Sequence, residues 1–350
     1  MQRGPRLLSR FRPMALLLVA MLLSAACGQP AAQPTASPAT PIPAATKPAE
    51  VAKPAVSPAM QPPAASPAAS PVASPAASPA AAAPRPVVTT ALPPPGNMPT
   101  NTYMRTIQER GVMRAGVKQD VLLFGYLNPR TNQIEGFDVD IARELARAIF
   151  GDPNRVDLRG MPSAARIPSL KEGVVDTVVS TMTITRERLG EIDFSDVYYE
   201  AGQTLLVPNN STITRIEDTA GKRVCSAKGS TSEANITRFS PQAIVVQADL
   251  YSECLLAVQQ GRADAVSTDD VILVGLAEQD SSMKLVGRPF TQEPYGIGIA
   301  KGHPEFVDFV NSVLAQIKQT GRWTEIHRQW LGRYIQTPAP PTRTAAEAAL

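Results

Sequence analysis

The chain has few of the residues on which metal and redox chemistry depend. Its 350 residues include two histidines, three cysteines and 5% aromatic residues. His303 and His327 stand apart, among residues typical of a turn and of a surface helix, so we expect both side chains to be solvated. Zinc sites are built from clustered histidine, cysteine and carboxylate ligands. The sequence therefore predicts no metal site, no cofactor and no catalysis by histidine.

Dense basic patches are also missing. The net charge of +3 is uninformative, because four arginines belong to the first 12 residues. Without a cluster of lysine and arginine, we expect no nucleic-acid partner. The segment 229–232 has the composition of a loop, but it lacks the flanking glycines of a nucleophile elbow and the lysine of a phosphate-binding loop.

The first 26 residues have the pattern of a secretory signal peptide. Arginines precede an apolar run at 14–23, which is too short to span a membrane, and small residues follow. The sequence Leu-Ser-Ala-Ala-Cys at 23–27 resembles a lipoprotein cleavage box, although Ser24 stands where leucine is usual. We predict that Cys27 carries lipid and becomes the new N-terminus. Conventional cleavage, with Cys27 left as a free thiol, is the alternative.

A proline-rich segment follows. Residues 28–99 hold 20 of the 34 prolines, with repeated Ala-Ser-Pro-Ala units. Such a composition buries too little apolar surface to offset its conformational entropy. We expect a disordered, extended stalk that packs on nothing and holds a folded part away from a membrane.

Alternating apolar and helical patterns then continue to about residue 335. A strand is predicted at 111–117, and Asp138 is the expected N-cap of a helix with an apolar stripe of Ile141, Leu145 and Ile149. A second helix is predicted at 163–173. This alternation favours a parallel α/β sheet with helices on both faces.

One stretch combines several signals of a binding site. A β-branched strand at 173–179 leads into Ser-Thr-Met-Thr-Ile-Thr-Arg-Glu-Arg at 180–188, where Thr185 is a good N-cap and Arg188 lies one turn further on. Open α/β sheets bind ligands beyond the carboxyl ends of their strands. Hydroxyls, free amides and a guanidinium suit a small carboxylate there. A surface arginine in an ordinary turn is the alternative.

This stretch, with Asp-Phe-Ser-Asp-Val-Tyr-Tyr at 193–199, resembles the central signature of bacterial extracellular solute-binding proteins, family 3. The resemblance covers about 106–332. It implies a two-lobed periplasmic-binding-protein fold (Venus-flytrap, type II) with hinge crossings near 205–210 and 287–295. The expected divisions are a signal peptide at 1–26, the lipidated stalk at 27–100, lobe 1 at 101–207 and 291–335, lobe 2 at 208–290, and a flexible tail at 336–350.

The family assigns roles to particular residues. By resemblance, the ligand's α-carboxylate meets Arg188, the hydroxyl and amide of Thr183, and backbone N–H groups at Thr231 and Ser232. Thr181, in the same turn, is also expected to bind the ligand. The α-ammonium needs an acid, because burying either charge unpaired costs several kcal/mol. That acid is expected to be Asp269, with Asp270 as the alternative.

Two further cations point to the ligand's side chain. Lys118 follows the first predicted strand, and Arg166 lies in a segment that the family turns toward the cleft. Together they resemble the glutamate- and aspartate-binding lipoproteins of the family. The resemblance thus implies a monomeric, non-enzymatic, extracytoplasmic receptor, anchored to the cell membrane by lipid, that delivers an acidic amino acid to an ABC permease. A receptor for glutamine or another polar amino acid, and a dehydratase-like enzyme on the same fold, are the alternatives.

The two remaining cysteines are Cys225 and Cys254, an even number in an exported protein. One belongs to a predicted strand of lobe 2 and the other to a helix that could pack on it. We predict a disulfide between them, with two buried thiols as the alternative.

Overall fold

The computed structural model describes residues 91–349. The predicted signal peptide, the lipidation of Cys27 and the stalk up to residue 90 lie outside the described residues. The description below concerns only the described residues of the unit that spans 78–350. Among residues 91–349, no helix has both the length and the apolar character that crossing a membrane requires.

The first sheet has the strand order β5-β1-β6-β15-β7. Strands β5, β1 and β6 are parallel, as the alternation of patterns predicts, whereas β15 runs antiparallel to both of its neighbours. It does so because the chain re-enters this lobe from the other one. The strands are β1 (Met113–Val117), β5 (Val156–Gly160), β6 (Thr177–Val178), β7 (Asp193–Phe194) and β15 (Gly298–Ile299).

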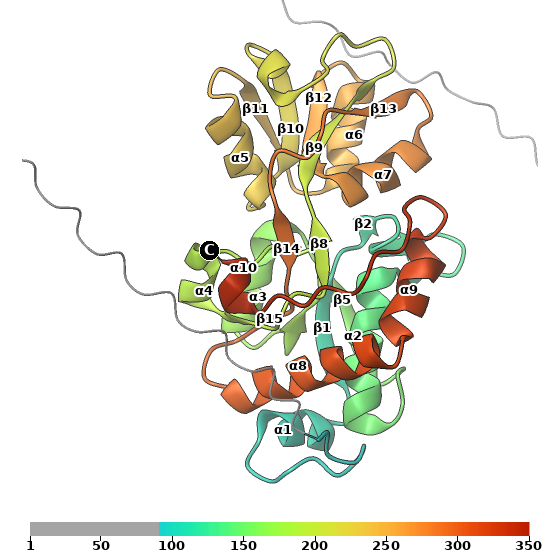
Figure 1. Ribbon diagram of the computed structural model, residues 1–350, viewed down its shortest axis with the longest axis vertical. Coiled ribbons are helices and arrows are strands. Elements are labelled where there is room, and N and C mark those ends of the chain that lie inside the picture. Colours follow the sequence, from blue (N-terminus) through green and yellow to red (C-terminus); the bar gives the residue numbers. More distant parts are fainter. Residues whose placement is uncertain (1–90, 350) are drawn as a thin grey trace, which may run out of the picture. The chain divides into compact units, whose positions relative to one another are not determined.

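Helices cover this sheet, and a small three-stranded sheet lies beside it (Figure 1). Ile141, Leu145 and Ile149 of α2 are buried against it, as the apolar stripe predicts. The helices are α1 (Tyr103–Arg110), α2 (Phe137–Phe150), α3 (Arg166–Lys171), α4 (Arg186–Glu191), α8 (Pro304–Gln319) and α9 (Arg322–Leu331); the small sheet has β2 (Asp120–Val121), β3 (Gly125–Asn128) and β4 (Gln133–Glu135).

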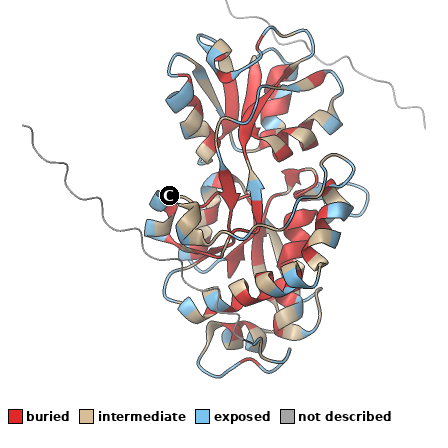
Figure 2. Cartoon of the chain, viewed as in Figure 1, coloured by how far each residue is buried: buried red, intermediate tan, exposed pale blue. Residues whose placement is uncertain are grey.

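The second sheet has the order β11-β10-β12-β9-β13, with β9 antiparallel to β12 and β13. The inner strands of both sheets are largely buried, whereas strands at the sheet edges are partly exposed, and other exposed residues gather on outer turns and helix faces (Figure 2). The elements are β9 (Gln203–Pro208), β10 (Arg223–Ala227), β11 (Ile244–Ala248), β12 (Ala265–Asp269), β13 (Met283–Val286), α5 (Thr231–Phe239), α6 (Tyr251–Gln259) and α7 (Asp270–Gln279).

Two strands connect the sheets. β8 (Tyr199–Ala201) and β14 (Glu293–Tyr295) pair antiparallel between the lobes (Figure 1). Because β9 already belongs to the second sheet, the first crossing ends before Gln203, earlier than the predicted crossing at 205–210 and boundary at 207. An apolar strand looks the same in sequence whichever sheet it joins, so its pairing decided its lobe.

The prediction that Asp138 caps α2 is wrong. The helix starts at Gly136, whose φ of 146° is open to glycine alone, and a Cβ there would lie 2.2 Å from the carbonyl oxygen of Phe124. The amides of Phe137 and Asp138 bond instead to the carbonyls of Leu123 and Phe124. Asp138 is thereby free to point into the protein.

The expectation that His327 is solvated is also wrong. Its side chain is fully buried, stacks on the ring of Tyr199 at 6.0 Å and contacts Trp323. Its Nδ1 lies 3.1 Å from the hydroxyl of Thr337. The helix α9 is amphipathic, and the position of His327 on its inner face became evident only when the packing against the hinge strand was known.

The C-terminal segment is not the frayed tail that its composition predicts. The amide of Val197 donates to the carbonyl of Arg343 (3.0 Å), and the guanidinium of Arg343 lies 3.5 Å from Glu200 of β8. The short helix α10 (Ala345–Ala348) follows, with a capping box formed by Thr344 and Glu347. The segment thus packs along the base of the hinge.

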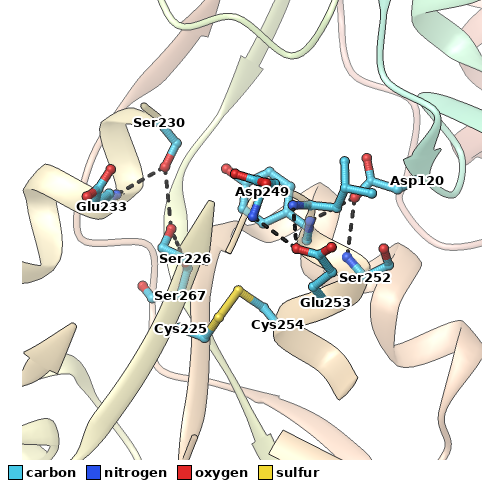
Figure 3. Close-up of a disulfide and its surroundings, with 12 residues drawn as sticks. Asp120, Cys225, Ser226, Ser230, Glu233, Asp249, Ser252, Glu253, Cys254 and Ser267 are labelled. Atoms are coloured by element: carbon cyan, nitrogen blue, oxygen red, sulfur yellow. Dashed lines mark hydrogen bonds between the residues drawn. A yellow bond between two sulfur atoms is a disulfide. The ribbon is translucent and has the colours of Figure 1, made fainter. Parts of the chain in front are cut away.

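The predicted disulfide is present. Cys225 of β10 and Cys254 of α6 are bonded, with an S–S distance of 2.06 Å (Figure 3). The bond fixes the first turn of α6 against the sheet of lobe 2.

The last residues of the predicted stalk pack on lobe 1. Met98 is 1% exposed, its amide donates to the side chain of Gln108, and the amide of Gly96 donates to the carbonyl of Ile149. The folded part therefore begins before residue 101, and the expectation that 28–99 packs on nothing is wrong for its last residues.

Because Met98 is packed on lobe 1, truncations on either side of it should differ in stability. A chain starting at residue 91 should melt at the same temperature as the full mature protein. One starting at residue 101 should lose about 2 kcal/mol of unfolding free energy, as when a buried methionine is removed. Thermal denaturation of the two truncations checks this, and the expected difference is several degrees. Equal melting temperatures would show that Met98 contributes nothing.

Candidate functional site

Segments from both lobes meet where their strands end. Lys118 follows β1, and the turn 180–185 follows β6. From lobe 2, the loop 228–230 follows β10 and Asp269 ends β12, while Glu293 opens the hinge strand β14. The site therefore lies at the carboxyl edge of both sheets, where α/β proteins bind ligands.

Arg188 joins the two lobes. The hydroxyl of Thr185 accepts from the Arg188 amide (3.2 Å), which confirms Thr185 as the N-cap of α4. The guanidinium donates to the carbonyl of Thr183 (2.7 Å) and, across the cleft, to that of Gly229 (3.2 Å). Burial lowers the pKa of this guanidinium, and Glu293 acts in the opposite direction. An arginine held this way presents a fixed positive charge to the cleft.

The turn before Arg188 is held in an unusual conformation. Thr181 has φ 42°, in the left-handed region that a β-branched residue rarely adopts. Its amide donates to the carboxylate of Asp138 (2.8 Å), which also accepts from the hydroxyl of Tyr198 (2.8 Å). Asp138 thus fixes the conformation of the turn at Thr181, a role that the sequence did not reveal.

Glu293 is the functional candidate that sequence reasoning missed. Its carboxylate is 2% exposed and accepts hydrogen bonds from Thr183 (2.7 Å), Thr231 (2.8 Å) and Asn235 (3.0 Å). It therefore links a turn of lobe 1, helix α5 of lobe 2 and the hinge. The only signal was an acid at the start of a strand that crosses between lobes, which is also the signal of an exposed edge residue.

Lys118 and Arg166 are both buried in the site. The ammonium of Lys118 donates to the hydroxyl of Ser163 (2.6 Å) and lies 5.3 Å from the ring centroid of Tyr251. Burial, and next the charge of Arg166, lower the pKa of Lys118 to about 7, while the carboxylates of Asp120, Asp138 and Asp269 act in the opposite direction.

The guanidinium of Arg166 is engaged by backbone. It donates to the carbonyls of Ser163 (3.0 Å), Ser180 (2.8 Å) and Thr181 (3.2 Å). Burial, and next the charge of Arg188, lower its pKa to about 9. Arg166 therefore shapes the turn that carries Thr181 as well as charging the site.

Asp269 and Asp270 have different surroundings. Asp269 is 3% exposed and accepts from the hydroxyls of Tyr295 (2.5 Å) and Ser232 (3.5 Å). Burial, with Glu293 as the second cause, raises the pKa of Asp269 to about 8. Asp270 instead accepts from the backbone at Gly202 and Val271 and starts α7. Of the two, Asp269 is the one among the other site residues.

The lobes are in contact over this site. The hydroxyls of Thr183 and Thr231 are 3.4 Å apart, and a Cβ at Gly229 would lie 2.9 Å from the Cα of Ala164. A cavity of about 780 Å³ opens beside the contact and is lined by Arg166 and Arg188, among others. Lys118 and Asp269 do not line it. The eight predicted binding residues thus form one cluster, with its arginines nearest the opening.

This fold and cluster define a class of protein. Residues 113–333 match the bacterial extracellular solute-binding proteins, family 3, and the chain belongs to that family.

Individual proteins that bind amino acids are similar to this chain. The ABC transporter glutamine-binding protein GlnH of Bacillus subtilis is 43% identical over 65% of this chain and 84% of that protein. The glutamate-binding protein GluB of Corynebacterium efficiens is 33% identical over 65% of this chain and 81% of that protein. Among solved structures, an ancestral arginine-binding protein bound to glutamine is 35% identical, covers 64% of this chain and 99% of its own, and superimposes with a TM-score of 0.60.

Replacing Glu293 should destabilise the protein. In Glu293→Ala, the buried donor Thr183 of lobe 1 and the half-buried donors Thr231 and Asn235 of α5 in lobe 2 lose this acceptor, which typically costs about 1–3 kcal/mol. Denaturant unfolding of the ligand-free protein measures this, with Glu172→Ala, at the exposed end of α3, as the control. Equal stability of the two variants would contradict the role of Glu293.

Proposed function

We propose that the protein is the extracytoplasmic substrate-binding component of an ABC importer, and that it closes its two lobes around glutamine and delivers it to the permease. The family membership, the glutamine-binding relative and the charges of the site support this proposal. It binds its ligand unchanged and acts as a monomer. Lipid on Cys27 is the proposed anchor to the outer face of the cell membrane.

The common part of any amino acid is recognised by three groups. Arg188, fixed by two carbonyls, takes the α-carboxylate with its remaining donors. The first amides of α5, at Thr231 and Ser232, have no intrahelical partner and add a positive dipole. Asp269 takes the α-ammonium. Thr181 and Thr183 border the carboxylate, and closing the lobes brings these groups to the ligand from both sides.

The proposal that the ligand is glutamine rests on the balance of buried charge in the site. Three cations of the site are matched by four carboxylates, and all seven groups are buried: Lys118, Arg166, Arg188, Asp120, Asp138, Asp269 and Glu293. Asp269 ionises to pair with the ligand's ammonium, which leaves the carboxylates in excess, and a zwitterionic ligand with a neutral side chain adds no further net charge. A side-chain carboxylate would add a negative charge where acids already outnumber cations, and buried unpaired charge is costly.

An acidic amino acid is the second candidate. Lys118 and Arg166, which led to that expectation, do lie together in the site, 1% and 2% exposed. Three nearby carboxylates already offset the charge of Lys118, however, and three carbonyls engage Arg166. The cations are therefore less available to a second ligand carboxylate than the sequence indicates.

A titration against several amino acids separates the candidates. We expect glutamine to bind at least about tenfold more tightly than glutamate, aspartate or arginine, because unpaired buried charge costs more than 1.4 kcal/mol. Calorimetry measures the affinities, and mass analysis of the released ligand tests whether it is unchanged. Glutamate or aspartate binding more tightly would select the second candidate.

Arg188→Ala should abolish binding of every amino acid, because all share the α-carboxylate. Lys118→Ala should instead alter the ratio of glutamine to glutamate affinity. Both variants are measured by the same titration, with Lys228→Ala at the cleft opening as the control. An Arg188→Ala protein that binds normally would overturn the assignment.

Binding should release a proton near neutral pH. The carboxyl of Asp269, with its pKa of about 8, is mostly protonated at pH 7 and must ionise to pair with an ammonium. Affinity should therefore rise between about pH 6 and 8. Calorimetry at pH 7 in two buffers of different ionisation enthalpy measures the release, and Asp270→Asn should leave it unchanged. Identical heats in both buffers would contradict the pairing.

A further inference from the structure

Helix α6 of lobe 2 takes its N-terminal cap from lobe 1. Its N-cap residue is Leu250, which has no side-chain acceptor, so the first amides of the helix have no cap of their own. One carboxylate oxygen of Asp120 accepts from the amides of Tyr251 (2.7 Å) and Ser252 (3.3 Å) across more than 130 residues of sequence. Figure 3 shows this carboxylate facing the start of α6.

Both partners of this contact are held rigidly within their own lobes. Asp120 is 7% exposed and belongs to β2, where it pairs with Tyr126 of β3. The disulfide between Cys254 and Cys225 fixes the first turn of α6 to β10. Neither side can follow the other when the lobes separate, so opening the cleft must break both hydrogen bonds.

We propose that Asp120 is a closure latch: its carboxylate caps α6 only when the lobes are shut, and so determines how tightly the receptor holds its ligand. The inference rests on the proposed function, since closure matters only for a protein that encloses a ligand. Asp120 is a positioning residue, because it acts through the helix and the lobe that carries it.

The energetics of capping set the size of the effect. Losing an N-cap destabilises the state that contains it, and the equilibrium constant for forming that state falls about two- to thirtyfold. Because the cap exists only in the closed state, its loss shifts the population toward the open state, and the apparent affinity falls by the same factor. Every amino acid that the receptor binds is affected equally.

A second carboxylate on the same helix provides a matched control. Glu253 of α6 accepts from the amides of Asp249 and Leu250, all within lobe 2. Removing it weakens the same helix end without touching the contact between lobes. Asp120→Ala and Glu253→Ala therefore separate closure from the stability of α6.

The experiment measures the dissociation constants of L-glutamine and L-glutamate for the full mature protein and both variants. Asp120→Ala should raise both constants about two- to thirtyfold with their ratio unchanged, and should speed dissociation. Glu253→Ala should lower the melting temperature without ligand and leave the constants as they are. Unchanged affinity in Asp120→Ala overturns the latch, and a changed ratio shows that Asp120 contacts the ligand instead.

A measurement without ligand distinguishes a failed latch from a failed function. Hydrogen exchange at the amides of Tyr251 and Ser252 reports the cap directly, whatever the receptor binds. These amides should exchange faster in Asp120→Ala than in the wild type. Equal rates, with and without added glutamine, overturn the proposal even if glutamine binds. Faster exchange in a protein that binds neither amino acid supports the latch while refuting the proposed ligand.

Discussion

Seven ionisable side chains are buried where the two lobes meet, and none could remain there unless the others balanced it. The low polarity of a protein interior makes an isolated charge far more costly than a paired one. Three cations and four carboxylates from both lobes and from β14 therefore constrain the closed state together. Burial is the largest cause of the pKa shifts of Lys118, Asp138 and Asp269, to about 7, 7 and 8.

Closure has two kinds of contact. Some use the groups proposed to bind the ligand, as when Arg188 reaches Gly229 and the hydroxyls of Thr183 and Thr231 share the carboxylate of Glu293. Others lie away from the cluster, such as the cap that Asp120 places on α6. A ligand can replace the first kind but not the second. Affinity and selectivity are thereby assigned to different residues.

The hinge is supported by segments that come late in the chain. His327 of α9 stacks on Tyr199 of β8, and Arg343 of the C-terminal segment contacts Glu200 of the same strand. The family match ends at residue 333, so the second of these contacts comes from chain beyond it. A segment outside the family match thus contacts the hinge.

The sequence by itself determined the α/β class, the two lobes, the N-cap at Thr185 and the pairing of Cys225 with Cys254. The α/β class and the N-cap follow from local patterns, the disulfide from counting cysteines in an exported protein, and the two lobes from the resemblance to a family, so none of the four requires knowledge of distant neighbours. It also pointed to the residues of the site, because the strand-to-helix turns that carry them have recognisable motifs. The tertiary structure alone decided what depends on partners far along the chain. It turned Asp138 inward, buried His327, packed Met98 and the C-terminal segment on lobe 1, and gave Glu293 and Asp120 partners in the opposite lobe. The sequence does not show whether a carboxylate or a histidine faces solvent or a partner about 100 residues away. Only the packing of the folded chain distinguishes these two environments.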